Sequence, residues 1–403
     1  MKEKIKKVLK NRPKLYAGAE WVSGFLADVA NASFFILSIL FSLMPKKKKI
    51  AIKSFYGRGY GNNAKYIVEE LVKHDSDVEI VWLVNKKGKE ESSFPSYITP
   101  VLDGRMRELY HLATAKVWID DCRKVRPIYK SRNQFYLQTW HSPLRPKKIE
   151  KDAGNMLSPR YVKSAKRDSK NIDLMISGCD FSHNIYQRAF WYEGEIAKVG
   201  TPRCDIFFKK DEAIIEKVRT HFGIPPGSAV VLYAPTFRRV ATDVYKFDYE
   251  KVRSAIGSKM NRECYMLIRL HPNVAHQSGD ISYSDKVMNA TYYEDMQDLL
   301  YVSDVLITDY SSSMFDMAIA RKVCIMFAPD YEYYIKAERE LYFDLDKLPF
   351  PLAKSESDLI DVLSCFDHEE YLKELEGFLC EIGNYEDGHA SKRIAEILIT
   401  KLS

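Results

Sequence analysis

The sequence has few of the features that mark metalloproteins or disulfide-stabilised proteins. Its seven cysteines are widely spaced, and no two of them form a C-x-x-C pair. This usage predicts reduced thiols in a cytosolic compartment, with core packing as the expected role of each. No histidines and carboxylates have the spacing of metal ligands either. We therefore expect no metal site and no cofactor. A bound Mg²⁺ ion is compatible with the sequence but not indicated by it.

The chain also lacks a G-x-G-x-x-G motif, an internal repeat and a long low-complexity linker. Gly57, Gly59 and Gly61 do follow an apolar segment, where they could cradle a phosphate or let two domains approach closely. Without the full motif they give only weak support for dinucleotide binding. The 46% apolar and 29% charged residues are typical of a globular protein, and 403 residues predict two domains.

Outside its N-terminus the sequence has no excess of positive charge. Residues 1–49 hold eleven Lys and Arg against three acidic residues, a net +8 within a total of +6, so the rest of the chain sums to −2. A nucleic-acid partner would be expected to need a basic face on the folded body. We therefore expect no nucleic acid, and the placement favours an anionic membrane surface.

Long hydrophobic runs are absent as well. The most apolar stretch, residues 32–44, is short for a bilayer span of about 20 residues, and extending it upstream brings in Asn31 and Asp28. Lysines flank it on both sides, which favours a helix lying in the cytoplasmic leaflet over one that crosses it. A signal peptide is less favoured because no small-residue cleavage site follows, and a buried core helix is the alternative. We expect peripheral, monotopic attachment to the cytoplasmic face of the membrane.

What the sequence does contain is an alternation of short apolar segments with helical ones. The predicted strands are residues 49–53, 78–85, 117–120, 135–139, 174–177, 229–233, 264–270, 305–307 and 323–327. This pattern predicts an α/β fold with two Rossmann-like, doubly wound domains facing one cleft. We expect residues 1–48 to form a membrane-associating segment, residues 49–200 the first domain and residues 201–403 the second.

Polar residues follow four of these predicted strands, where open parallel sheets bind ligands. His141 comes directly after residues 135–139, between Trp140 and Ser142. A neutral imidazole there can accept a hydroxyl proton near neutral pH, so we predict a general base. The alternative is a histidine satisfied in the domain interface.

The segment after residues 305–307 predicts a phosphate site. A turn at residues 309–311 leads into a helix, and backbone N–H groups, hydroxyls and the helix dipole together favour an anion. The alternative is that Ser311 or Ser312 only caps the helix. Two further strand ends offer cationic or hydrogen-bonding groups for a diphosphate, namely Arg238, Arg269 and His271. For each of these a structural arginine or capping histidine is the alternative.

The candidate residues occur in an ordered series of motifs. The series runs through Ser54 and Gly57, 63–67, 138–141, 147–152, 200–203 with Asp205, 234–238, 269–272, 308–312 and 342–344. It resembles the CDP-glycerol glycerophosphotransferase family, the teichoic-acid primases and polymerases of Gram-positive bacteria. The resemblance extends from about residue 50 to the C-terminus and is far more specific than any single motif.

The resemblance implies a GT-B fold whose C-terminal domain holds the donor and whose last helix returns to the first domain. It also implies a CDP-alditol donor and a polyprenyl-diphosphate-linked acceptor. By position, the implied catalytic residues are His141, His271 and Asp309. The implied or predicted donor-diphosphate residues are Arg238, Arg269, Thr308, Ser311, Ser312 and Ser313. Acceptor or cleft contacts are predicted for Ser54, Gly57, Asn63, Trp140, Ser142, Lys147, Lys148 and Arg203.

The chain departs from the family at two positions. The family usually has His-Gly-Thr-Pro where this chain has residues 141–144, and Cys204 replaces a commonly polar residue. Both changes affect the expected acceptor geometry more than the chemistry. We predict transfer of an alditol phosphate, first of all glycerol phosphate, to an acceptor hydroxyl with release of CMP. The alternatives are a CDP-ribitol enzyme, a GT-B glycosyltransferase using a nucleotide sugar, and an inactive membrane-associated scaffold.

Overall fold

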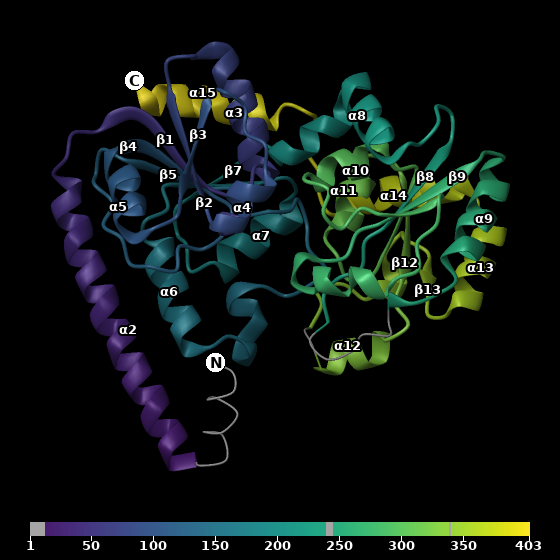
Figure 1. Ribbon diagram of the computed structural model, residues 1–403, viewed down its shortest axis with the longest axis horizontal. Helices are drawn as coiled ribbons and strands as arrows, with labels where there is room; N and C mark the ends of the chain where they lie inside the picture. The colour runs from purple at the N-terminus through teal and green to yellow at the C-terminus, as the bar shows by residue number, and fades with distance from the viewer. Residues whose placement is uncertain (1–12, 239–244, 338–339) are drawn as a thin grey trace.

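The computed structural model describes residues 13–238, 245–337 and 340–403, which form two α/β domains side by side with one long helix along the first (Figure 1). The first domain contains a parallel seven-stranded sheet in the order β3-β2-β1-β4-β5-β6-β7. Its strands are β1 Lys47–Lys53, β2 Glu79–Val84, β3 Ile98–Leu102, β4 Ala115–Asp120, β5 Phe135–Gln138, β6 Leu174–Ser177 and β7 Glu195–Lys198. Its helices are α3 Asn62–His74, α4 Lys86–Glu91, α5 Arg105–Thr114, η1 Glu150–Met156, α6 Pro159–Ser169 and α7 Asp180–Ala189.

Strand β1 shows why this sheet is covered on both faces. Ile50 and Ile52 lie in one core cluster with Ile67 of α3, while Ala51 lies in another with Leu109 of α5. Successive side chains of a strand point to opposite faces, so an uninterrupted apolar strand requires helices on both sides.

The second domain repeats the plan with a parallel six-stranded sheet in the order β10-β9-β8-β11-β12-β13. Its strands are β8 Ala229–Tyr233, β9 Cys264–Ile268, β10 Val287–Asn289, β11 Val305–Thr308, β12 Val323–Phe327 and β13 Leu352–Ala353. The helices are α8 Glu212–Phe222, α9 Tyr249–Met260, η4 Pro272–Asp280, α10 Met296–Val302, α11 Ser313–Ile319, α12 Tyr331–Ala337, η5 Leu345–Lys347, α13 Glu356–Cys365 and α14 His368–Glu381. The predicted α/β fold with two doubly wound domains is confirmed.

The chain crosses between the domains twice. It passes to the second through η2 Pro202–Phe208 and returns to end in α15 Ala390–Leu402, which packs Ile394 and Leu398 into the core beneath β1. The Asp205 carboxylate accepts hydrogen bonds from the backbone N–H groups of Ala390 (3.1 Å) and Ser391 (2.7 Å), which fixes the start of α15. The division into residues 1–48, 49–200 and 201–403 stays a prediction.

Helix α2, Pro13–Ser42, is longer than the apolar run in the sequence indicated. Its residues 24–42 have a mean hydropathy of 1.8 and are only 11% buried, so the helix is long and apolar enough to cross a membrane. This corrects the inference that the segment is too short to span, although one such helix is weak evidence of a membrane. The alternative of a buried core helix does not fit, since Leu26 and Ile36 are each 60% exposed. Residues 1–12, with most of the basic start, lie outside the described residues.

The cysteines are free, and five of them are buried as predicted. Cys365 and Cys380 are exposed, so the expectation of core packing is wrong for these two. They lie near the ends of α13 and α14, whose buried residues are on other positions of each helix.

Candidate active site

His141 lies just beyond the end of β5, in a turn where Trp140 has a positive φ of 52°. The Nδ1 atom of its half-buried ring lies 2.9 Å from the backbone oxygen of Asp121. A carbonyl oxygen can only accept, so a neutral ring carries its proton on Nδ1 and leaves Nε2 with a lone pair. Burial, followed by the charge of Arg145, lowers the pKa of His141 well below its usual value. The ring is therefore neutral at pH 7 and can accept a proton through Nε2.

Asp121, which holds His141, is itself fixed by the loop after β1. Its buried carboxylate accepts hydrogen bonds from Ser54 Oγ (2.6 Å), Asn62 Nδ2 (2.7 Å) and the backbone N–H of Phe55 (2.8 Å). The Phe55 ring meets the His141 ring edge-on, with centroids 6.1 Å apart. Ser54 therefore acts on the site by positioning Asp121.

Gly57 allows this loop to turn. Its φ is +81°, and a Cβ atom there would lie 2.8 Å from the backbone nitrogen of Asn85. That same nitrogen donates to the Gly57 carbonyl at 2.8 Å. A side chain would therefore be strained and would break the contact between the β1 and β2 ends.

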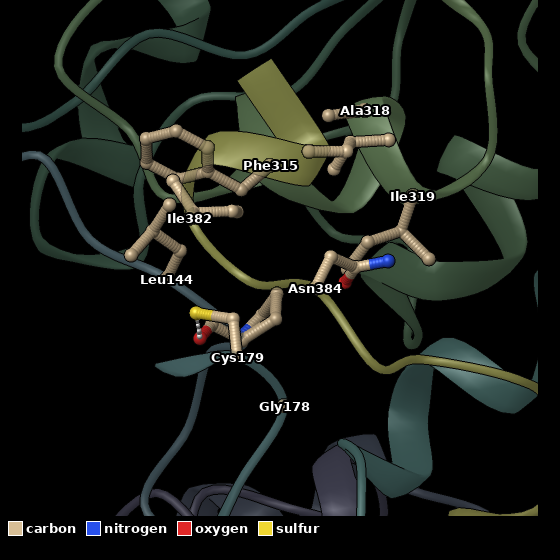
Figure 2. Close-up of a pocket in the computed structure, with 10 residues that line it drawn as sticks. Leu144, Gly178, Cys179, Phe315, Ala318, Ile319, Ile382 and Asn384 are labelled. Carbon is tan, nitrogen blue, oxygen red and sulfur yellow. Dashed lines mark hydrogen bonds between the residues drawn. The ribbon is translucent and has the colours of Figure 1, made fainter. Parts of the chain in front are cut away.

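The turn that follows His141 is anchored in the second domain. Leu144 lies beside Phe315 and Ile382 around a small apolar cavity of about 10 Å³ (Figure 2). Ser142 accepts a hydrogen bond from Arg145 Nε at 2.8 Å, and its own carbonyl accepts from Tyr186. The serine that replaces the family's usual glycine thus has a defined place in the turn.

His271 lies at the end of β9 with the opposite hydrogen-bonding pattern. Its Nδ1 atom accepts from the backbone N–H of Asn273 at 3.1 Å, so a neutral ring carries its proton on Nε2 and can donate it. Burial, then the positive charges of Lys147 and Arg58, lowers the pKa of His271 to about 4. Two cations of the first domain thus act on a histidine of the second, which is a suitable setting for an anion.

Arg238 lies beyond the end of β8 and is buried, and every N–H group of its guanidinium has a partner. It donates two hydrogen bonds to Asp330 (2.6 and 3.0 Å), two to Thr236, and forms an ion pair with Asp309 at 2.8 Å. Its guanidinium also lies 4.9 Å from each of the rings of Tyr310 and Tyr334. Burial disfavours its charge, but the two carboxylates outweigh this and raise its pKa. All five of its N–H groups are used, so the geometry favours support of the site over direct contact with phosphate.

The carboxylate of Asp309, at the end of β11, is likewise held by several hydrogen-bond and ion-pair partners. Its carboxylate accepts from the backbone N–H groups of Thr236 (2.9 Å) and Tyr310 (2.6 Å) and pairs with Arg238. An acid held by that many donors orients its neighbours. Its predicted catalytic role stays a prediction, and the contacts favour positioning.

The serines lie between this acid and α11. Ser311 and Ser312 are partly exposed, whereas Ser313 is buried and donates to Ser311 Oγ at 2.8 Å. Ser311 Oγ accepts from the backbone N–H of Ser313 at 3.3 Å, so the capping alternative fits Ser311. Ser312 is the N-cap residue but makes no side-chain capping bond. Thr308 is buried and donates to the Ala234 carbonyl, which joins β11 to β8.

Arg269 also has structural contacts. Its guanidinium donates to the carbonyl oxygens of Tyr293 (2.5 Å) and Ala290 (3.4 Å), and burial lowers its pKa to about 10. These contacts tie the end of β9 to the segment after β10. They favour the structural alternative for Arg269, and its diphosphate role stays a prediction.

Two predicted cleft residues form a buried link between the domains. Arg203 pairs with Asp316 of α11 at 2.5 Å, and its backbone N–H donates to Asn63 Oδ1 at 3.1 Å. Asn63 Nδ2 in turn donates to the carbonyl of Trp140 at 3.0 Å. Both residues therefore position the His141 turn relative to the second domain.

The segment around Lys147 and Lys148 also joins the domains. Lys147 forms an antiparallel bridge with Leu341, and Lys148 pairs with Glu340 at 2.5 Å. Lys147 Nζ lies 5.3 Å from the Tyr334 ring, near His271. Lys147 thus faces the site, while Lys148 lies at its rim.

Contacts between the domains bring these strand ends together: Arg58 donates to Asn273, Lys147 and Arg58 act on His271, and Arg203 pairs with Asp316. A model of the CDP-glycerol:poly(glycerophosphate) glycerophosphotransferase family matches residues 35–400 of this sequence. The chain belongs to this family. The resemblance and the phosphotransferase class inferred from the sequence motifs are thereby confirmed.

Relatives that align over nearly their whole length include a teichoic acid glycerol-phosphate transferase of Staphylococcus aureus, 33% identical over 89% of this chain and 95% of its own. A teichoic acid ribitol-phosphate primase of Bacillus spizizenii is 28% identical over 91% of this chain and 94% of its own. Among solved structures, a histidine-to-alanine variant of the wall teichoic acid polymerase TagF superposes with a TM-score of 0.79 at 25% identity, covering 94% of this chain and 98% of that one. Another TagF structure was obtained after a soak with CDPG.

Three residues of this glycerophosphotransferase site escaped the sequence analysis. Asp121 acts through its backbone oxygen, Asp330 lies 92 residues from the arginine it binds, and Arg58 reaches Asn273 across the cleft at 3.4 Å. Asp121 follows a strand end, which is the signal that could have found it. Arg58 lies between Gly57 and Gly59, in the glycine-containing segment after the first predicted strand, whereas nothing local marks Asp330.

Within residues 13–238, 245–337 and 340–403, no three His, Cys, Asp or Glu residues are grouped to hold a metal ion. The expectation that the protein needs no cofactor is untested by this and stays a prediction.

Proposed function

We propose that the protein transfers an alditol phosphate, first of all glycerol phosphate, from a CDP-linked donor to a hydroxyl of a polyprenyl-diphosphate-linked acceptor and releases CMP. Membership of the family and the S. aureus glycerol-phosphate transferase support the donor and the involvement in teichoic acid synthesis. The exposed apolar α2 supports action at the cytoplasmic face of a membrane.

The observation that carries the mechanism is the hydrogen bond between His141 Nδ1 and the Asp121 carbonyl. It selects the tautomer in which Nε2 is a proton acceptor. In the proposed step the acceptor hydroxyl gives its proton to Nε2 while its oxygen forms a bond to the alditol-bearing phosphorus. The phosphoanhydride bond breaks, and its electron pair leaves with CMP.

Negative charge develops on the phosphoryl oxygens during this displacement, and the second domain provides the groups that can hold it. His271 donates from Nε2, while Lys147 and Arg58 add positive charge. Ser311 and Ser312 add partly exposed hydroxyls. Such groups act by positioning and electrostatics, the main sources of catalysis in phosphoryl transfer. Arg238 and Asp309 hold the strand ends of the second domain in place through their mutual ion pair and hydrogen bonds.

We also propose that no resident cofactor takes part. A Mg²⁺ ion, where present, would enter with the substrate diphosphate. Turnover by protein dialysed against EDTA, with and without added Mg²⁺, tests this proposal, and an absolute metal requirement would contradict it.

The function is tested by supplying the full chain with a short lipid-linked acceptor and either CDP-glycerol, CDP-ribitol or a UDP-sugar. We expect CMP release and a product heavier by glycerol phosphate. Release of UDP, or no CMP from either CDP-alditol, would contradict the proposal. Ribitol phosphate is the second candidate because a ribitol-phosphate primase is among the full-length relatives, and the product mass distinguishes it.

A further inference from the structure

A large groove lies between α2 and α6 of the first domain. Its volume is about 790 Å³, and its walls come from α2, from residues 123–127 after β4 and from residues 158–167 around α6. Figure 1 shows α2 running along the first domain on the side where α6 lies. The proposed chemistry assigns no role to this groove.

The groove is basic. Its lining contains five Lys and Arg residues and one acid, Asp28. Arg123 is neutralised by Glu150 and Arg126 by Glu108. The other three, Arg160, Lys163 and Arg167, form no ion pair with a carboxylate in the described part of the chain.

Arg167 is also fixed in position. It donates to the Val125 carbonyl at 2.9 Å and to Ser164 Oγ at 3.2 Å. Burial lowers its pKa, so a bound anion would stabilise its charge. The groove thus has a held cation as well as the two exposed ones on α6.

The α2 side of the groove is partly apolar and continues into an exposed apolar surface. Ala32 and Phe35 line it beside the polar Asp28 and Asn31, and the same helix leaves Ile36 and Leu40 more than half exposed. A ligand with an anionic head and a long apolar chain matches this combination, since the head can meet the cations while the chain follows α2.

One residue that lines the groove is next in the chain to a residue that contacts His141. Tyr56 lines it, and the preceding residue, Phe55, contacts the His141 ring and donates to Asp121. A head group held in the groove would therefore place whatever it carries near the proposed general base.

We propose that the α2–α6 groove binds the diphosphate of the membrane-anchored acceptor and directs the acceptor's hydroxyl end toward His141. This inference rests on the proposed function, because it names the subsite for that acceptor. A bulk anionic phospholipid shares the phosphate chemistry, but its head carries no acceptor chain, and the connection through Tyr56 favours the diphosphate lipid.

The test compares two double variants on the same helix. Arg160→Gln with Lys163→Gln removes two charges from the groove, while Lys166→Gln with Lys170→Gln removes two exposed charges, one on α6 and one directly after it, that do not line the groove. We expect the first pair to raise KM for a polyprenyl-diphosphate-linked acceptor about tenfold or more, since charged hydrogen bonds are lost. KM for CDP-glycerol should change less than about twofold, and the control pair should have no larger effect on either substrate.

A binding experiment, which does not depend on turnover, distinguishes a polyprenyl diphosphate from a phospholipid as the ligand of the groove. The full-length wild type and both double variants are sedimented with phosphatidylcholine vesicles containing either polyprenyl diphosphate or phosphatidylglycerol. Selective loss by the groove variant on polyprenyl diphosphate supports the proposal. Equal loss on both vesicles, or none, overturns it. If the wild type transfers no alditol phosphate, the proposed function fails. The sedimentation experiment still tests whether the groove binds a polyprenyl diphosphate.

Discussion

His141 and His271 occupy equivalent places, each just beyond a parallel strand. Their hydrogen bonds nevertheless make Nε2 a proton acceptor in one ring and a hydrogen-bond donor in the other. His141 Nδ1 faces a carbonyl oxygen, which leaves Nε2 as an acceptor. His271 Nδ1 faces a backbone N–H, which leaves Nε2 as a donor. Both rings are neutral at pH 7 because burial lowers their pKa values. The backbone around each ring, and not the residue type, therefore separates a candidate base from a candidate phosphate ligand.

The largest effect should follow from replacing His141. Neither His141→Asn nor His141→Gln can accept the hydroxyl proton, so we expect kcat to fall about a thousandfold in both. Affinity for CDP-glycerol, measured by calorimetry, should stay within about threefold, since we propose that the other domain binds the donor. A near-normal kcat would remove His141 from the role of base.

The next largest effect should come from the buried ion pair between Arg238 and Asp330. Replacing Asp330 with Asn leaves part of the Arg238 charge buried without its partner, which we expect to cost about 3 kcal/mol of unfolding free energy. Urea denaturation followed by fluorescence measures it. Asp344→Asn is a control at a carboxylate whose cation partner, Lys347, is 3.9 Å away and exposed, and it should cost less than about 1 kcal/mol. Equal costs would contradict the supporting role given to Arg238.

A smaller and more selective effect is expected at His271. The amide nitrogen of Gln can take the place of Nε2, whereas Asn reproduces only Nδ1. His271→Asn should therefore weaken CDP-glycerol binding about tenfold, and His271→Gln should recover most of that loss. If Asn and Gln weaken binding equally, the Nε2 donor is not what holds the donor substrate.

The contrast between the histidines also shows what the sequence can predict. The strand ends, the two doubly wound domains and the family were accessible because apolar periodicity and motif order are local signals. The tautomers were not, because they depend on a carbonyl of Asp121 and an N–H of Asn273 that only the fold brings into place.

The arginines illustrate the same limit. Arg238 and Arg269 both follow strands, and the sequence assigned both to the diphosphate. In the structure one is enclosed by Asp309 and Asp330, and the other binds two backbone carbonyls. The partners of each lie 21 to 92 residues away, so residue type and strand position could not separate contact from support. Helix α2 was underestimated because polar Asn31 and Asp28 interrupt the apolar run without ending the helix.

The smallest effect is expected from pH, and it distinguishes the two histidines in one enzyme. A base with a lowered pKa stays deprotonated as the pH falls through 6.5, so kcat/KM should change less than about twofold between pH 8 and 6.5. At lower pH, protonation of His141 should reduce it by up to about tenfold per pH unit. Burial also lowers the pKa of His271, to about 4. In His271→Gln only His141 of the two can titrate. The decline should therefore persist in His271→Gln, and its disappearance there would assign the titrating group to His271 instead.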